Sequence, residues 1–132
     1  MNFMQIKETC LYTKNLHSAE EFYSHILGLE KIVSAQNRHV FFRVGSSVLL
    51  IFNPEVTRNE KDLPPHFGSG KMHVAFEVKQ EDYISTREKI LSKGVKIIHE
   101  QDWPGGFKSF YFSDPDEHLL EIVESGMWDK KL

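Results

Sequence analysis

The sequence predicts an α+β fold built from two βαβββ modules, because one order of elements occurs twice in its 132 residues. The first copy is expected to contain a strand at 7–13, a helix at 18–27 and three short strands that end near Phe52. The second copy is expected to contain a strand at 73–78, a helix at 81–93 and strands at 95–98, 110–112 and 119–123. Each helix is followed by a glycine, and these glycines are 94 − 28 = 66 residues apart. We therefore expect a curved mixed sheet with both helices on its outer face.

The helices are predicted from local chemistry. Ser18 and Glu21 have the spacing of a capping box, which predicts that the first helix begins at Ser18. The apolar residues that follow recur on one helical face, at Ala19, Phe22, Tyr23, Ile26 and Leu27. Gly28 and Gly94 then stand where a helix ends in a left-handed residue without a Cβ atom.

Strand alternation predicts which side chains share a face. In the strand at 73–78, the apolar residues Val74, Phe76 and Val78 are expected to pack on a helix. His73 is then directed to the opposite, concave face. The same alternation groups Glu8 with Cys10 and Tyr12 on the first strand, and Leu119 with Glu121 and Val123 on the last.

Length and composition indicate one domain over residues 1–132, with modules at about 5–52 and 72–124 and a connector at 53–71. A single βαβββ module is too small to form a stable core by itself. The modules are therefore expected to pack together or to be exchanged with a second chain, and a homodimer is expected.

Charge and patterning exclude several classes of partner. The net charge is −3, with both signs interspersed, which argues against nucleic acid and membranes and favours a small-molecule partner. No apolar run approaches the ~20 residues of a membrane span, and the first residues lack a signal-peptide pattern. A cytoplasmic location is expected. The single cysteine, Cys10, agrees with a reducing compartment and is interpreted as a small strand residue rather than a nucleophile.

Glu121 is the most informative acidic residue, because apolar residues surround it on the last strand. A buried carboxylate needs a hydrogen bond, an ion pair or a bound cation. Taken alone, Glu121 is better explained by an ion pair or a hydrogen bond to a neighbouring strand. Taken alone, His73 is better explained as a core histidine whose hydrogen bonds are satisfied. The repeat changes this balance, because Glu8 and His73 occupy nearly equivalent places, 73 − 8 = 65 residues apart. Together the three residues favour a metal site with open positions, the form of a catalytic centre.

Several segments together resemble the vicinal oxygen chelate superfamily, which includes glyoxalase I, bleomycin-resistance proteins, fosfomycin-resistance thiol transferases, methylmalonyl-CoA epimerase and extradiol dioxygenases. The resemblance covers about Gln5 to Trp128 and rests on the duplicated module and on three segments: Phe22-Tyr-Ser-His-Ile-Leu-Gly-Leu, Met72-His-Val-Ala-Phe-Glu-Val and Phe110-Tyr-Phe-Ser-Asp-Pro-Asp-Glu-His-Leu-Leu-Glu-Ile-Val-Glu.

The resemblance implies that Glu8, His73 and Glu121 hold a divalent metal ion, with Mn, Fe(II), Ni or Zn as candidates. It further implies a lyase, isomerase or thiol transferase acting on a small metabolite or antibiotic with two adjacent oxygens. Glu121 or Glu8 would then be the catalytic carboxylate that moves a proton. The chain departs from the usual pattern at the first ligand, where Glu8 stands for His or Gln, and at Leu49, where four-ligand members have Glu. Glu117 also replaces the usual turn glycine.

Further residues are candidates for the substrate pocket: Cys10, Tyr12, Leu49, Trp103, Phe107, Lys108 and Leu119. The segment 103–107, Trp-Pro-Gly-Gly-Phe, suits a lid over a cavity and an ordinary hairpin turn equally well. Lys108 and Lys130 are the candidate cations for a charged substrate. The sequence is also compatible with two other classes of protein. One is a metal-free protein that sequesters a drug, and the other is an inert structural dimer.

Overall fold

The computed structural model describes residues 1–129, so Lys130 lies outside the described residues. The chain divides into two compact units, the first from Met1 to Gly70 and the second from Lys71 onward. Each unit contains one four-stranded sheet. None of the described helices is long and apolar enough to cross a membrane.

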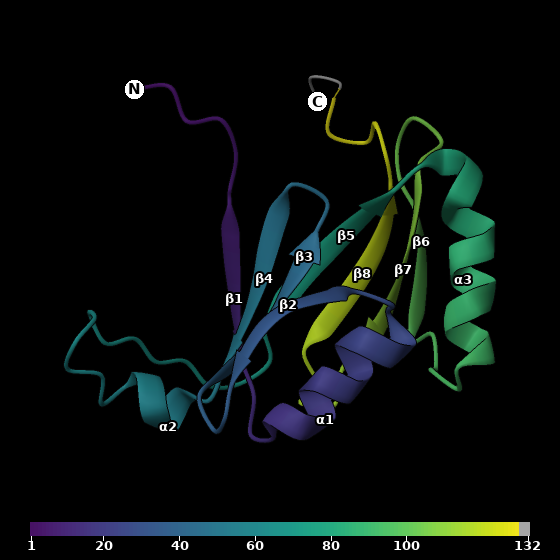
Figure 1. Ribbon diagram of the computed structural model, residues 1–132. Helices are drawn as coiled ribbons and strands as arrows, with labels where there is room; N and C mark the ends of the chain where they lie inside the picture. The colour runs from purple at the N-terminus through teal and green to yellow at the C-terminus, as the bar shows by residue number, and fades with distance from the viewer. Residues whose placement is uncertain (130–132) are drawn as a thin grey trace. The chain divides into compact units, whose positions relative to one another are not determined.

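The first unit is a mixed sheet with one helical segment against it (Figure 1). Its strands are β1 (Glu8–Tyr12), β2 (Glu30–Ala35), β3 (His39–Val44) and β4 (Ser47–Phe52). They lie in the order β1-β4-β3-β2, with β1 parallel to β4 and the other neighbours antiparallel. Helix α1 (Leu16–Glu21) continues as a π-helical turn, η1 (Phe22–Ile26), and the short helix α2 (Pro54–Thr57) follows β4.

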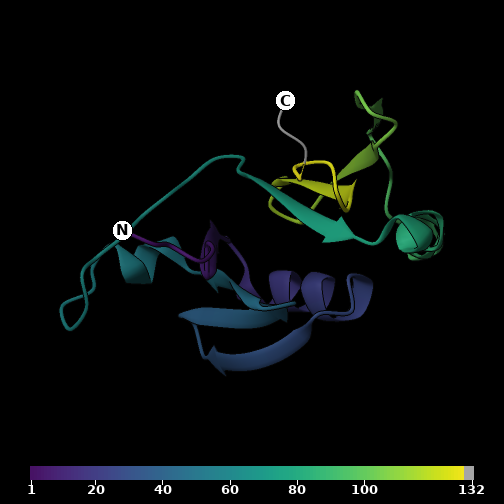
Figure 2. The same ribbon diagram turned by 90° about the horizontal axis from the view of Figure 1, so that it is seen from above.

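The second unit repeats this topology. Strands β5 (His73–Val78), β6 (His99–Asp102), β7 (Lys108–Ser113) and β8 (Leu119–Glu124) lie in the order β5-β8-β7-β6, with β5 parallel to β8. A 3₁₀ turn, η2 (Gln80–Asp82), leads into α3 (Tyr83–Ser92). Figure 2 views α3 nearly end-on beside its sheet. The predicted α+β class with two βαβββ modules is confirmed.

Each sheet buries the face that its helix covers. In the first unit this face carries Leu11, Leu49 and Ile51, and the ring of Tyr23 from the helix lies 5.8 Å from the ring of Phe42. In the second unit Tyr83 of α3 meets Phe110 edge-on, with 5.5 Å between ring centroids. The opposite face of each sheet is therefore left for other chemistry, as strand alternation predicts.

Two local predictions need correction. Helix α1 begins at Leu16, because the side chain of Asn15 accepts a hydrogen bond from the backbone N–H of Ser18 at 3.0 Å and so provides the N-cap. The expected strand at 95–98 is instead β6 at His99–Asp102. That strand is an edge strand of polar residues, so it carries no apolar alternation by which the sequence could reveal it.

The glycines that end the two helices behave as predicted. Gly28 has φ of 70° and Gly94 has φ of 82°, which is the left-handed region that residues with a Cβ atom rarely adopt. The helical segments of the two units therefore end at equivalent positions of the repeat.

Candidate metal centre

His73 and Glu121 meet on neighbouring strands of the second unit. Strands β5 and β8 run parallel, with His73 beside Leu119 and Ala75 beside Glu121. This register brings Nε2 of His73 to 3.3 Å from Oε2 of Glu121. The contact lies on the face of the sheet away from α3, as strand alternation predicts.

A backbone contact orients the imidazole of His73. Its Nδ1 lies 2.9 Å from the carbonyl oxygen of Leu119. A carbonyl oxygen only accepts, so Nδ1 carries the proton and donates it. In the neutral ring the lone pair is therefore on Nε2, the atom beside Glu121, and a metal-binding histidine commonly has this arrangement.

Glu121 is buried, whereas His73 is accessible. The Glu121 side chain is 8% exposed and the His73 side chain 49% exposed. Oε1 of Glu121 is buried and has no hydrogen-bond partner among residues 1–129. A buried unsatisfied carboxylate oxygen is costly, and a bound cation removes that cost. The donor set of one imidazole and one carboxylate oxygen fits a divalent metal ion.

Tyr111 is a further residue of this face, and the sequence-based reasoning missed it. It lies directly beside Glu121 in the β7–β8 register, and its ring centroid is 6.2 Å from that of His73. Burial, together with a hydrogen bond and the negative charge of Glu121, raises the pKa of Tyr111. Its hydroxyl is thus a protonated donor. The signal was present, since Tyr111 has the opposite strand parity to Phe110 and Phe112.

The third predicted ligand, Glu8, lies on β1 of the first unit and is exposed. Its role as a metal ligand stays a prediction from the repeat. Cys10 and Tyr12 follow on the same strand face. Burial raises the pKa of Cys10, so this thiol stays protonated, in line with its interpretation as a strand residue. The Tyr12 hydroxyl lies 2.7 Å from Nδ1 of His66 in the connector.

Two predicted pocket residues lie on the other side of their sheets. Leu49 is 2% exposed and belongs to the helix-facing core. The pairing of Cys10 with Leu50 shows that Leu50, not Leu49, is the first-copy counterpart of Glu121. Lys108 has the parity of Phe110 and lies on the α3 side of the second sheet, so it cannot share the face of Glu121. The register with β1 decides the face of Leu49, whereas alternation along β7 decides the face of Lys108.

The remaining pocket candidates lie at opposite ends of the second sheet, with Leu119 at the start of β8 and the hairpin of Trp103 and Phe107 beside its other end. Leu119 shares the face of Glu121. Trp103 and Phe107 close the hairpin between β6 and β7, with the Trp103 N–H donating to the Phe107 carbonyl at 2.8 Å. Trp103 Nε1 also donates to the Ser109 hydroxyl at 2.8 Å. These bonds favour the hairpin interpretation of this segment over a lid.

A second group of potential ligands occupies the turn before β8. Ligand atoms of Asp114, Asp116 and His118 lie within 4.8 Å of one another. Asp114 Oδ1 accepts from the backbone N–H groups of Asp116 and His118, and His118 Nδ1 accepts from the Met72 N–H at 2.9 Å. Glu117 has φ of 64°, so it adopts the left-handed conformation despite its Cβ atom. These contacts give the group a structural role in joining the turn to the start of β5.

Comparison with known proteins gives the family. A model of the Glyoxalase/Bleomycin resistance protein/Dioxygenase superfamily matches residues 5–122. The chain belongs to this superfamily. The predicted vicinal oxygen chelate fold is thereby confirmed.

Individual relatives are named as transferases of thiols or glutathione and as a lyase. The chain is 26% identical to the metallothiol transferase FosB of Shouchella clausii, over 82% of this chain and 71% of that protein. It is 29% identical to the glutathione transferase FosA of Serratia marcescens, over 85% and 74%. The crystal structure of lactoylglutathione lyase from Agrobacterium tumefaciens superposes with a TM-score of 0.90 and 28% identity, covering 96% of this chain and 97% of that one. These relatives are consistent with a metal-dependent thiol transferase or lyase.

Proposed function

We propose that this protein is a metal-dependent thiol transferase that acts on a small molecule with two adjacent oxygen atoms. The observation that carries the proposal is the His73–Glu121 pair, in which an oriented imidazole faces a buried carboxylate with an unsatisfied oxygen. A buried carboxylate oxygen without a hydrogen-bond partner is suited to binding a cation. The names of the relatives supply the class of reaction.

The proposed ligands are Nε2 of His73, the carboxylate of Glu121 and the carboxylate of Glu8. Two carboxylates and one imidazole form a hard donor set, which favours Mn, Fe(II) or Ni over Zn. A divalent ion held there supplies Lewis-acid stabilisation of negative charge that develops on the two substrate oxygens.

The chain's own groups have separate roles in this proposal. The Leu119 carbonyl keeps the proton on Nδ1 of His73, which leaves Nε2 for binding. The hydroxyl of Tyr111, held protonated by its raised pKa, donates a hydrogen bond at the Glu121 side of the site. Cys10 is not the nucleophile because its raised pKa keeps it a thiol, so the reacting thiol belongs to a separate cosubstrate.

A glyoxalase-like lyase is the second candidate. The similarity to lactoylglutathione lyase favours it, and so does the charge of the site face. Among the described strand residues of the second unit, the face of Glu121 carries no lysine or arginine. An uncharged reacting group suits such a face better than a phosphonate does. In this reaction Glu121 or Glu8 would carry the proton between adjacent carbons.

The first test is the metal content of the purified protein after incubation with Mn, Fe(II), Ni and Zn in turn. We expect about one equivalent per chain, lost in His73→Ala. Glu77→Gln is the matched control, because Glu77 is an exposed carboxylate on the same face of β5, and it should keep the metal. Absence of binding under all conditions would overturn the proposal and leave the metal-free sequestering protein as the function.

A second assay separates the two reactions. Loss of free thiol in the presence of fosfomycin tests thiol transfer, whereas turnover of the hemithioacetal of glutathione and methylglyoxal tests the lyase. Chelation should abolish whichever activity is found. Metal binding with neither activity would place the substrate outside both tested classes.

We also propose a homodimer in the cytoplasm. Strands β1 and β5 are both at the edge of their sheets, so each unit offers an unpaired strand edge for association. The single cysteine agrees with a reducing compartment. Sedimentation velocity of the purified chain tests the dimer, and a monomer at every concentration would refute it.

A further inference from the structure

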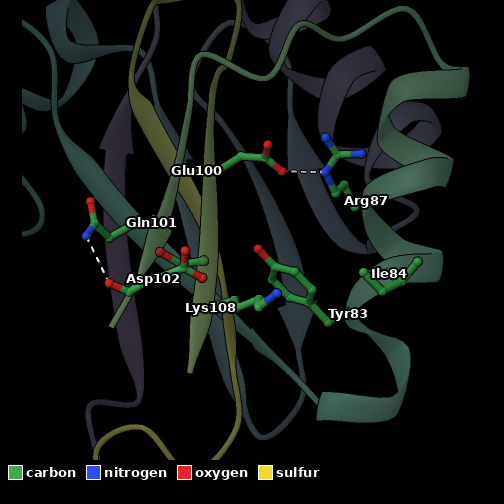
Figure 3. A pocket seen from close by; sticks show the side chains of 8 residues that line it. Tyr83, Ile84, Arg87, Glu100, Gln101, Asp102 and Lys108 are labelled. Carbon is green, nitrogen blue, oxygen red and sulfur yellow. Dashed lines mark hydrogen bonds and ion pairs between the residues drawn. The ribbon is translucent and has the colours of Figure 1, made fainter. Parts of the chain in front are cut away.

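The second unit contains a cavity on the side of its sheet opposite to His73 and Glu121. It has a volume of about 260 Å³ and lies between α3 and the strands β6 and β7 (Figure 3). This volume is below the usual range for drug-sized ligands and suits a molecule of few atoms. Its lining residues are Tyr83, Ile84, Arg87, Glu100, Gln101, Asp102, Lys108 and Ser109.

Some of the lining groups are already paired with protein. Arg87 Nε donates to Glu100 Oε1 at 2.6 Å, so these two charges neutralise each other. The Ser109 hydroxyl accepts from the Trp103 indole. These paired groups form one wall of the cavity.

Three other groups remain available. Asp102 and Lys108 are directly opposed across β6 and β7, yet among residues 1–129 neither side chain has a hydrogen bond or an ion pair within 4.0 Å. The hydroxyl of Tyr83 likewise has no hydrogen-bond partner in that range. Figure 3 shows the Tyr83 hydroxyl directed into the space that Asp102 and Lys108 border.

Tyr83 presents a polar atom to this cavity from a side chain that is otherwise buried. The residue is 4% exposed, and its hydroxyl is within the small accessible part of the side chain, where it opens to the cavity. Burial and the nearby carboxylates of Glu100 and Glu124 raise its pKa to about 12, so it remains a neutral group that can donate. A ligand in the cavity would give this hydroxyl the partner that the protein does not provide.

We propose that the cavity binds a free amino acid in its zwitterionic form. Its ammonium group pairs with Asp102, its carboxylate pairs with Lys108 and accepts from the Tyr83 hydroxyl, and its side chain lies along Ile84. A simple cation would meet Lys108 and a simple anion would meet Asp102, whereas a zwitterion satisfies both charges. This inference does not depend on the proposed metal centre.

The test uses three ligands of one carbon skeleton: L-leucine, 4-methylpentanoate and 3-methylbutylamine. Titrations of the ¹⁵N-labelled full chain, followed by NMR, should show L-leucine binding most tightly, with shifts in α3, β6 and β7. Lys108→Met should weaken L-leucine about tenfold or more and leave the amine unaffected, and Asp102→Asn should weaken L-leucine equally and leave the carboxylate unaffected. Tyr83→Phe should weaken L-leucine several-fold.

Matched controls keep the test decisive. Lys96→Met and Asp62→Asn remove exposed charges outside the cavity and should bind L-leucine as the parent does. A folded parent chain without L-leucine binding at millimolar concentration would overturn the inference. Binding that survives both Lys108→Met and Asp102→Asn would also overturn it, because the ligand would then lie elsewhere. The spectra report directly whether each variant is folded.

Discussion

The two units share a backbone frame but differ at one decisive position. In both, the first strand is parallel to the fourth, and the residue opposite Cys10 in the first unit corresponds to the residue opposite Ala75 in the second. That residue is Leu50 in one copy and Glu121 in the other. A repeated fold thus supplies equivalent places, while a single side chain decides which of them suits a metal ion.

The first unit uses the same face for aromatic contacts. His39 stacks on Phe41 with ring centroids 4.1 Å apart, and Phe52 meets His66 edge-on at 4.7 Å. Tyr12 links this cluster to the connector through its hydrogen bond to His66. The face of the second unit carries instead the acid and imidazole of the candidate centre. Glu8 is the residue of the first unit that the proposed centre would use.

The largest expected effect tests this contribution. If Glu8 is the third ligand, Glu8→Gln should lower metal affinity by about 10- to 100-fold or more, because a charged donor is lost. Glu30→Gln is the control, since Glu30 is also an exposed carboxylate on an edge strand of this unit. Isothermal titration with Mn measures both. An unchanged affinity in Glu8→Gln would confine the centre to the second unit.

The next prediction converts the second copy into the first. Glu121→Leu should abolish metal binding yet raise the free energy of unfolding of the metal-free protein by about 1–3 kcal/mol, because it removes a buried oxygen without a partner. The reciprocal change, Leu50→Glu, should lower that free energy by introducing an unpaired charge. Urea unfolding in the presence of a chelator measures both. A destabilised Glu121→Leu would mean that the contacts of the carboxylate with His73 and Tyr111 outweigh the cost of its unpartnered oxygen.

Some features of the fold and of the candidate site could be predicted from the sequence alone. Gly28 and Gly94 were predictable because a left-handed helix stop depends on one residue. The pairing of His73 with Glu121 was predictable from alternation and repeat. Both inferences use information that lies along a single stretch of chain or at one fixed offset.

The missed features depend on how separate strands align. Leu50 and Leu49 are equally apolar, and only the register with β1 distinguishes the face from the core. Tyr111 is next to Glu121 only because β7 pairs with β8 in that register. The cavity beside Tyr83 is formed by α3 and a polar edge strand that has no apolar pattern. Tertiary arrangement decides each of these cases.

A smaller effect distinguishes the helices of the two units. Helix α1 has a side-chain cap from Asn15, whereas α3 has no side-chain cap. Asn15→Ala should therefore lower the free energy of unfolding by about 1 kcal/mol. Ser18→Ala removes no cap and should change it by less than about 0.5 kcal/mol. Urea unfolding distinguishes the two, and a larger loss in Ser18→Ala would restore the capping box predicted from the sequence.

The smallest effect concerns the aromatic cluster of the first unit. Burial lowers the pKa of His39 below its ordinary value of 6.5, and the adjacent charge of Arg38 adds to this effect. Arg38 Nη1 also donates to His39 Nδ1 at 2.7 Å, so the folded chain holds this imidazole neutral. Because the unfolded chain then takes up the proton more readily, this contribution to stability is complete above pH 6.5 and declines as the pH falls below it.

His39→Gln should accordingly reduce the loss of unfolding free energy between about pH 8 and about pH 5. His17→Gln is the matched control, because His17 is an exposed histidine of α1, and it should keep the slope of the parent. Urea unfolding at the two pH values measures the difference. An identical slope in His39→Gln would mean that His39 titrates alike in the folded and unfolded chain. The stacking of His39 on Phe41 would then be equally favourable in both protonation states of the imidazole.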